Sequence, residues 1–249
     1  MRRLQYTFIF LLGCAALAPA YSDPLFEAQY KGNFGKMSAN STRTLEQIDG
    51  DRYQFQSIAK STFASLVENS EFDNKESGFR AIQYRYRRNV IGFKSIQTLT
   101  FDWQNMSVSY ERKDRPKKNT TYSIDSTTLD PALYQLQMQK DAYLGATEFH
   151  YHFAKQGRIK DLDFKVSGKV DYTIGSTTYS GLRIERINPE SSENTVVIII
   201  PELMYQIADI DHRDDDGSHY LIRLVKFDCD RKALDAFYSH STSTMVHNN

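Results

Sequence analysis

The chain has 249 residues, and its 31 Lys and Arg balance 31 Asp and Glu, so the formal net charge at pH 7 is zero. That balance argues against recruitment of nucleic acid or anionic lipid by a global positive field. Hydrophobic residues make up 40% of the chain, with 16 Tyr and 15 Phe, which excludes a disordered protein and favours half-buried sheet surfaces over helical bundles.

The first twenty residues have the features of a cleavable signal peptide. Arg2 and Arg3 precede an apolar run over residues 6–17, and residues 18–20 (Ala-Pro-Ala) match the small-x-small pattern read by a signal peptidase. The run is too short to span a bilayer comfortably, which disfavours a retained anchor. A second option is a lipoprotein anchored through Cys14, since residues 11–14 resemble a lipoprotein cleavage box. We expect an exported, periplasmic protein that begins at Tyr21.

Cleavage after residue 20 would leave Cys229 as the single cysteine, so no internal disulfide is expected. The neighbouring Asp228 and Asp230 would raise the pKa of the thiol, which makes Cys229 a spectator rather than a nucleophile.

Short segments of alternating polarity dominate the rest of the chain and predict β-strands. Asp49-Gly50 is a strong hairpin signal between strands over 38–48 and 51–60. Further strands are expected at 79–87, 95–103, 107–111, 148–153, 162–172, 177–187, 195–200, 205–212 and 219–227. Residues 112–119 are expected to form an exposed basic loop. We predict one all-β domain over residues 21–238 and a tail over 239–249.

One amphipathic helix interrupts this pattern. Asp130 is a suitable N-cap, Pro131 suits the first helical position, and Gly145 is placed to end the helix. The residues expected on its apolar face are Leu133, Leu136, Tyr143 and Leu144. A second, short helix is expected over residues 230–238. The predicted fold is a mostly-β protein with a single antiparallel, strongly curved sheet, a half-barrel or open barrel, and one amphipathic helix packed against it.

Three short motifs resemble the domain of unknown function 3108 family of exported bacterial envelope proteins. They are Phe101-Asp102-Trp103, Leu129-Asp130-Pro131, and the segment from Ile200-Pro201-Glu202 to Asp216-Gly217. The resemblance implies an antiparallel sheet curled around an apolar interior, similar to half-barrel envelope carriers of lipids or lipoprotein chains. It implies no catalytic residues, and the link to carriers rests on the fold alone.

Glu148, His150 and His152 are the weak candidates for a metal site. In a strand they share one face, and two imidazoles with a carboxylate can bind zinc or iron. However, residues at i, i+2 and i+4 spread along the strand, so a metal would need ligands from elsewhere. A solvated strand face, with Phe149 and Tyr151 turned to the core, is the favoured interpretation, and no metal or other cofactor is predicted.

Two further clusters of charge invite functional interpretations. Asp211 to Gly217 is acidic, but both ends of the calcium-loop template fail, so it is predicted to be a hairpin turn. The basic residues are Arg85, Arg87, Arg88, Arg112, Lys113, Arg115, Lys117 and Lys118, with Tyr84, Tyr86 and Tyr110 interleaved. A solvated face is the favoured interpretation of this cluster, ahead of contact with lipid head groups or envelope polymers, and nucleic acid is disfavoured.

The sequence lacks the glycine frames of serine hydrolases, phosphate-binding loops and dinucleotide-binding folds, so an enzyme is not expected. We expect a periplasmic protein that holds a lipid-like or acyl ligand in its curved sheet. An alternative is a structural or assembly factor whose strand edges bind another envelope protein. A metal-dependent hydrolase centred on His150 and His152 is a third option. Membrane association is expected only with lipidation at Cys14.

Overall fold

The structure, a computed structural model, describes residues 23–34, 37–187 and 193–240. The first eight strands are β1 (Phe26–Phe34), β2 (Met37–Asp49), β3 (Arg52–Lys60), β4 (Ala64–Lys75), β5 (Gly78–Val90), β6 (Phe93–Asp102), β7 (Ser107–Arg112) and β8 (Thr120–Ser123). The later strands are β9 (Glu148–Lys155), β10 (Arg158–Ile174), β11 (Thr177–Ile187), β12 (Asn194–Ile200), β13 (Gln206–Arg213) and β14 (His219–Cys229). The helices are α1 (Leu133–Tyr143) and α2 (Arg231–Ser239), with short 3-10 turns at Pro116–Lys118 and Pro201–Leu203.

All fourteen strands belong to one antiparallel sheet in the order β8-β7-β6-β5-β4-β3-β2-β1-β14-β13-β12-β11-β10-β9. Neighbours in the sheet are also neighbours in the chain, with one exception, the pairing of β1 with β14. The two free edges of the sheet are therefore β8 and β9, which α1 and its flanking segments connect in the chain. The predicted single, antiparallel, curved sheet is confirmed.

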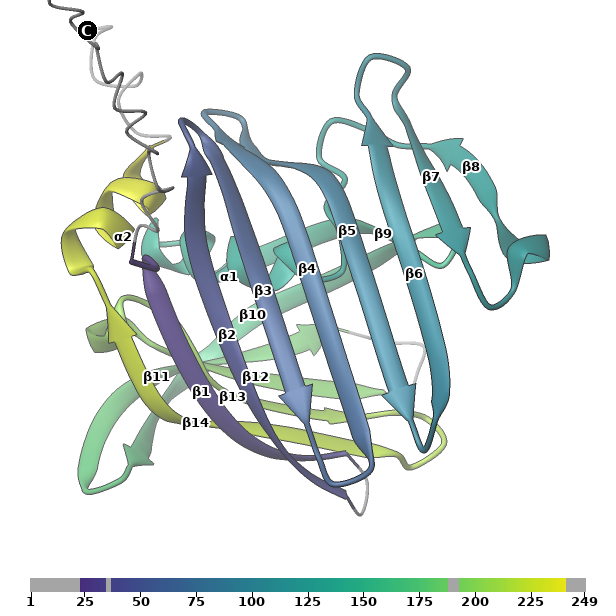
Figure 1. The fold of residues 1–249 in the computed structure, drawn as a ribbon. Helices are drawn as coiled ribbons and strands as arrows, with labels where there is room; N and C mark the ends of the chain where they lie inside the picture. Colours follow the sequence, from purple (N-terminus) through teal and green to yellow (C-terminus); the bar gives the residue numbers. More distant parts are fainter. Residues whose placement is uncertain (1–22, 35–36, 188–192, 241–249) are drawn as a thin grey trace, which may run out of the picture.

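The sheet folds over on itself, so that its two halves face each other. In Figure 1, strands β1 to β6 form the near layer, strands β9 to β13 cross behind them, and α1 lies between the two layers. Residues 129 and 153 form a parallel bridge in which the N–H of Leu129 donates to the carbonyl of His152 at 2.8 Å. The segment before α1 thus covers part of the β9 edge, and the barrel remains open between β8 and β9.

Local sequence signals explain most of the strands. The Asp49-Gly50 turn joins β2 to β3 as expected, and Gly50 has the positive φ of 52° that such a turn requires. In β9 the side chains alternate between solvent and interior, with Phe149, Tyr151 and Phe153 buried. Strands β1, β4 and β8 were not predicted from the sequence.

Helix α1 packs inside the sheet rather than on its surface. Leu133 and Leu136 are fully buried as expected, but Leu144 is 46% exposed, and the polar Gln139 and Lys140 are also buried. Every residue of α1 is buried or partly buried because the helix lies between two sheet layers, so its buried polar residues need interior partners. The helix is therefore packed on the sheet as predicted, but no side of it is fully exposed to water.

Helix α2 closes one end of the interior through an aromatic cluster. Phe237 of α2 contacts Tyr53, Phe72 and Phe79, with ring centroids 4.8, 6.3 and 5.4 Å away. Tyr53 lies at the start of β3, Phe72 near the end of β4 and Phe79 at the start of β5. The same end of these three strands is therefore filled with packed rings. Asp230 caps the start of α2, because its side chain accepts from the N–H of Ala233, and the bounds of the helix are close to those predicted.

Candidate ligand-binding cavity

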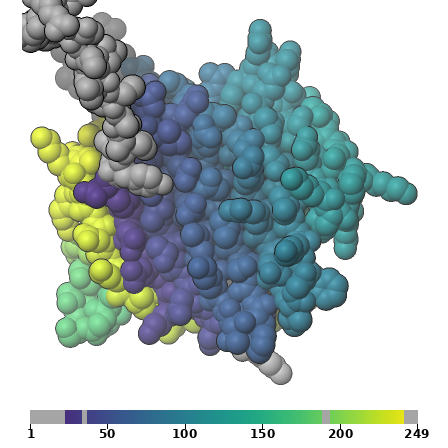
Figure 2. Space-filling view, in the orientation of Figure 1, coloured from purple at the N-terminus to yellow at the C-terminus, as the bar shows by residue number. Residues whose placement is uncertain are grey.

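A cavity of about 600 Å³ lies between the two halves of the sheet. Ala59 at the end of β3, Leu66 at the start of β4 and Tyr86 late in β5 line it, so it occupies the end of these strands opposite to the α2 cluster. Residues from β9 to β14 form its other wall. The outer face of β1 to β6 is a continuous surface in Figure 2, so the hollow is on the inner side of the sheet. Its volume is typical of small-molecule sites.

Aliphatic and aromatic side chains form a large part of the cavity wall. They come from both halves of the sheet and from the first turn of α1, and they include Ala59, Leu66, Tyr86, Leu99, Tyr110, Tyr134, Phe153, Leu162, Phe164, Ile210 and Ile222. Alternation along each strand places these residues inside and their neighbours outside. An elongated apolar group could lie against these side chains.

Two charged side chains on the β2 to β5 wall face the cavity. Among the described residues no carboxylate forms an ion pair with Arg43, and its guanidinium lies 5.2 Å from the ring centre of Tyr30. Glu68 accepts a hydrogen bond from the hydroxyl of Tyr84 at 2.5 Å. Burial, and then the charge of Glu68, raises the pKa of Tyr84 well above its usual value, so Tyr84 stays protonated and keeps donating. Arg43 is thus available to an anionic ligand.

Several charged groups of the opposite wall are paired with one another. Arg186 donates to Glu193 at 2.5 Å, and His212 contacts Thr195 at 2.7 Å and Asp214 at 2.9 Å. Lys155 and Lys160 also line this wall, but both side chains are exposed to solvent, whereas Arg43 is half-buried. Arg43 is therefore the cation that a ligand inside the cavity would meet away from bulk water.

Asp130 fixes the start of α1 at the inner end of the cavity. Its carboxylate accepts from the N–H groups of Ala132 and Leu133 at 2.8 and 2.9 Å, and it also accepts from the Ser70 hydroxyl. This is the capping role expected from the sequence, although the helix begins at Leu133 and not at Pro131. Asp130 is fully buried, and desolvation raises its pKa to about 6 despite these hydrogen bonds. Pro131 and Tyr134 next to it line the cavity.

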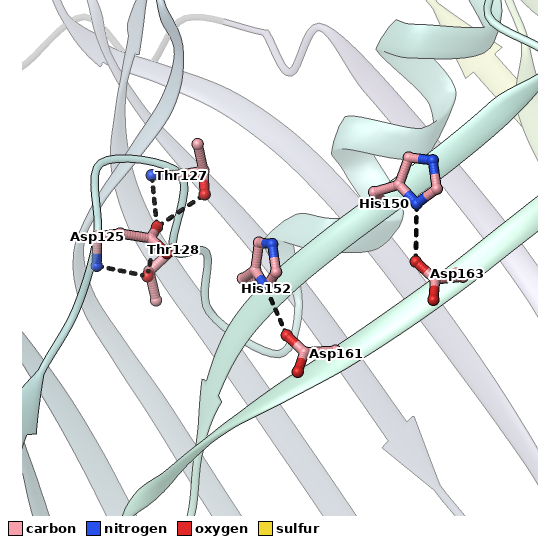
Figure 3. Close-up of polar contacts among 7 residues, drawn as sticks. All are labelled: Asp125, Thr127, Thr128, His150, His152, Asp161 and Asp163. Carbon is pink, nitrogen blue, oxygen red and sulfur yellow. Dashed lines mark hydrogen bonds and ion pairs between the residues drawn. The ribbon is translucent and has the colours of Figure 1, made fainter.

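The metal candidates Glu148, His150 and His152 lie on the exposed face of β9 and do not converge. Figure 3 shows each imidazole facing its own carboxylate on β10: His150 Nδ1 lies 2.8 Å from Asp163, and His152 contacts Asp161. In the part of the chain that the structure describes, no group of three or more His, Cys, Asp or Glu side chains is arranged to hold a metal ion.

The loop that precedes α1 lies close to His152 in Figure 3. Asp125 holds this loop in a turn, because its carboxylate accepts from the N–H of Thr127 at 2.9 Å and from the hydroxyl of Thr128 at 3.0 Å. The hydroxyl of Thr127 also donates to this carboxylate, at 2.7 Å, and is the largest influence that lowers the pKa of Asp125, with smaller contributions from the other hydrogen bonds and from His152. The carboxylate is therefore engaged in a structural turn.

The alternating basic and aromatic residues of β5 lie on opposite faces of the sheet. Arg85 and Arg87 of β5 are exposed, whereas Tyr84 and Tyr86 line the cavity from the other face, so rings and guanidinium groups do not form one stacking surface.

The acidic segment near Gly217 is a turn between β13 and β14, as expected. Burial is the largest influence on Cys229 and raises the pKa of its thiol. Sequence reasoning missed Arg43 and Glu68, because isolated charges in strands look like solvated residues.

By its fold, the protein is a barrel-like β-protein, in which a curved antiparallel sheet surrounds a helix and a cavity. A solved structure described as a beta-barrel-like protein of domain of unknown function DUF1849 from Brucella abortus is similar to it, with a TM-score of 0.53 and 8% sequence identity. That similarity covers 84% of this chain and 98% of the other, and at this identity it concerns the fold alone. The chain belongs to the family described as Protein of unknown function (DUF3108), whose model matches residues 26–227. No curated protein matches the chain.

Two of the motifs that suggested this family have structural roles. Asp102 accepts from the N–H groups of Gln104 and Asn105 and shapes the turn between β6 and β7, while the indole of Trp103 donates to the carbonyl of Ala81 at 2.7 Å. Leu129 bridges to β9, and Asp130 caps α1. Both motifs build the scaffold around the cavity.

Proposed function

We propose that this protein is an exported, non-enzymatic envelope protein that holds a lipid-like ligand with an acyl chain in its interior cavity. The observation that carries the proposal is the amphipathic lining. An apolar wall is shared by both halves of the sheet, and one side carries the half-buried cation Arg43, which forms no ion pair with a carboxylate among the described residues. A ligand with an apolar chain and an anionic head fits both features. Export is the expectation from residues 1–20, which lie outside the described residues.

The apolar wall supplies most of the expected binding free energy. Burial of apolar surface contributes about 25 cal/mol per Å², and a chain lying against Leu66, Leu99 and Phe164 would be shielded by both layers. Arg43 would orient the ligand through a charge-assisted hydrogen bond to its head group, since such bonds contribute roughly 1.5–3 kcal/mol.

The alternative of an assembly factor that binds partners through strand edges has less support. One edge of the sheet, β9, is already partly paired, because the N–H of Ala154 donates to the carbonyl of Leu129 at 2.9 Å. The other edge, β8, spans four residues. Short or covered edges are poor templates for adding a further strand.

The first experiment is native mass spectrometry of protein purified from its own host. The proposal predicts a bound mass that is released as a lipid or acyl species on denaturation. Repeated preparations without such a species would count strongly against it. Tandem mass spectrometry of the released molecule would then give its head group.

A second experiment asks whether the ligand occupies this cavity. Leu66→Trp should fill part of the cavity and weaken binding of a dansyl-labelled fatty acid by at least tenfold. Val67→Trp is the matched control, because Val67 is the next residue on β4 and does not line the cavity. Equal binding by the two variants would place the ligand elsewhere.

A third experiment addresses the head group. Arg43→Gln should weaken binding of the same anionic probe about tenfold, which corresponds to 1.4 kcal/mol, and should leave binding of an uncharged dansyl-labelled fatty alcohol nearly unchanged. Arg85→Gln, on the outer face of β5, is the control. An equal effect of Arg43→Gln on both probes would assign Arg43 a structural role instead.

A further inference from the structure

Two neighbouring turns carry the most exposed large apolar side chains in the described part of the chain. Phe63, in the turn between β3 and β4, is 67% exposed, and Ile91 and Phe93, at the turn between β5 and β6, are 73% and 82% exposed. The turns touch, because the N–H of Ile91 donates to the carbonyl of Phe63 at 2.9 Å. The three residues therefore form one projection, which we call the apolar tip.

The apolar tip contributes little to the packing of the protein. Its side chains belong neither to the buried core nor to the partly buried residues packed against it. Scattered surface hydrophobics are common, but three large ones on adjacent turns form a local patch of the kind found at interaction sites. The question is therefore which partner covers them.

The charges around the apolar tip are positive. Lys60, Arg88 and Lys94 flank it and are exposed, and residues 55–67 and 77–101 contain no Asp or Glu. The nearest acid beside β6 is Asp114, which accepts from the Ser95 hydroxyl at 2.9 Å and forms a bidentate pair with Arg112. Because that carboxylate is already neutralised, the tip presents a net positive field although the whole chain is neutral.

Apolar residues that project between lysine and arginine side chains match the chemistry of a bilayer surface. Aromatic and aliphatic groups enter the boundary between head groups and acyl chains, and cations beside them pair with anionic lipid phosphates. A partner protein that covered the tip would need an acidic rim, and a second copy of this chain would bring two positive tips together. The charge pattern therefore favours lipid.

We propose that the apolar tip is a bilayer-contact site, in which Phe63, Ile91 and Phe93 insert into the head-group region of an anionic membrane. The tip lies at the cavity end of the sheet, since Ala59 and Leu66 line the cavity on either side of the turn that carries Phe63. In Figure 1, the turns between β3 and β4 and between β5 and β6 lie along the lower margin. The turn between β13 and β14 lies along the same margin and carries the exposed Asp215 and Asp216, so the proposed contact is confined to the apolar tip. Bilayer contact at the tip would bring the cavity end of the sheet close to lipid.

The test is flotation of the purified protein with vesicles of phosphatidylethanolamine and phosphatidylglycerol, compared with phosphatidylcholine alone. We expect binding to the anionic vesicles that weakens as salt is raised. The variant Phe63→Ser/Ile91→Ser/Phe93→Ser should lose at least tenfold in partitioning. The control Ile48→Ser/Leu144→Ser/Val225→Ser removes three exposed apolar residues elsewhere and should bind as the unmodified protein does.

A second readout reports insertion directly. Phe93→Trp should add a fluorescence signal that shifts to the blue and is quenched by brominated lipids, relative to the protein with its single native Trp103. Lys60→Gln/Lys94→Gln should reduce the salt dependence of binding. Each of these exposed substitutions should leave the thermal unfolding temperature unchanged.

Several outcomes would overturn the proposal. One is that the unmodified protein fails to bind anionic vesicles, and another is that the tip and control variants bind equally. A third such outcome is that the unmodified protein and the control variant sediment as dimers while the tip variant sediments as a monomer. The last result would assign the tip to a second copy of the chain. The vesicle test is independent of the proposed function. Native mass spectrometry should find the same cavity ligand in the tip variant and in the unmodified protein, even where only the unmodified protein binds vesicles.

Discussion

The ammonium group of Lys140 lies 3.0 Å from the side-chain oxygen of Asn74, and the amide nitrogen of Asn74 donates to the carbonyl of Phe237 at 2.8 Å. One buried asparagine therefore joins α1, β4 and α2. Lys140 is 1% exposed, and desolvation lowers its pKa to about 8. It also lies 5.0 Å from the ring centre of Phe79. The arrangement explains how a lysine is tolerated inside the sheet.

Replacing Asn74 should therefore be costly. Asn74→Ala leaves a buried ammonium group and a buried carbonyl without partners, and we expect a loss of about 2–4 kcal/mol in the free energy of unfolding. The measurement is urea denaturation followed by circular dichroism. Asn69→Ala, on the same strand, removes a half-buried hydrogen bond to Gln56 and should cost less than about 1.5 kcal/mol. Similar losses for both variants would show that the buried network around Asn74 stabilises the protein no more than a single half-buried hydrogen bond does.

The raised pKa of Asp130 gives a prediction for pH. Because the folded state holds the Asp130 proton more tightly than the unfolded state does, stability from this group is greatest below about pH 4 and falls as pH rises towards 6. The effect should approach about 3 kcal/mol. Asp130→Asn keeps an oxygen acceptor for the start of α1 and removes the titration. Urea midpoints of the two proteins, measured from pH 4 to 7, should diverge, and parallel curves would contradict the prediction.

The aromatic cluster at α2 should dominate the stability of that end of the sheet. Phe72 is fully buried, and its ring centre lies 4.9 Å from that of Phe79 and 5.9 Å from that of Tyr53. Phe72→Ala should therefore lower the free energy of unfolding by about 3–5 kcal/mol. Phe93→Ala, at an 82% exposed position, should change it by less than about 0.5 kcal/mol. The free energies of unfolding of the two variants can be measured by thermal and urea denaturation. Equal losses in the two variants would contradict the prediction.

The histidine and aspartate pairs between β9 and β10 should matter little. Their side chains are between 46% and 68% exposed, so water and salt screen their attraction. His150→Ala/His152→Ala should cost less than about 1 kcal/mol. Zinc should change the thermal unfolding temperature of this variant and of the unmodified protein equally. A zinc-dependent rise that the double variant abolishes would revive the metal hypothesis.

Sequence periodicity predicted the parts of the fold that depend on local rules. The alternation over residues 148–153 correctly separated Phe149 and Tyr151 from His150 and His152, and Asp49-Gly50 located a hairpin. The strand expected over residues 195–200 is β12, in which Val197 through Ile200 are buried. The family was also predicted correctly, and its model matches most of the chain.

The cavity could not be predicted because it depends on which distant strands face each other. Arg43 and Phe164 meet at the same hollow only because the sheet folds over, and no local pattern encodes that. Strand β4 was missed for a related reason. Its alternation is weak, since Glu68 and Ser70 point inward to Tyr84 and Asp130. Buried polar residues whose partners are remote in sequence look like surface residues in the sequence alone.

The pairing of β1 with β14 has a consequence for how the molecule assembles. Phe26 lies opposite Cys229 and Phe34 opposite Tyr220, so partners roughly 200 residues apart must meet before the two halves of the sheet are joined. Every other strand pair can form from a hairpin or a short connection. Completion of the barrel therefore waits for the last strand of the chain to be synthesised, and a ribosome-bound or prematurely ended chain would expose the inner faces of two unjoined sheets.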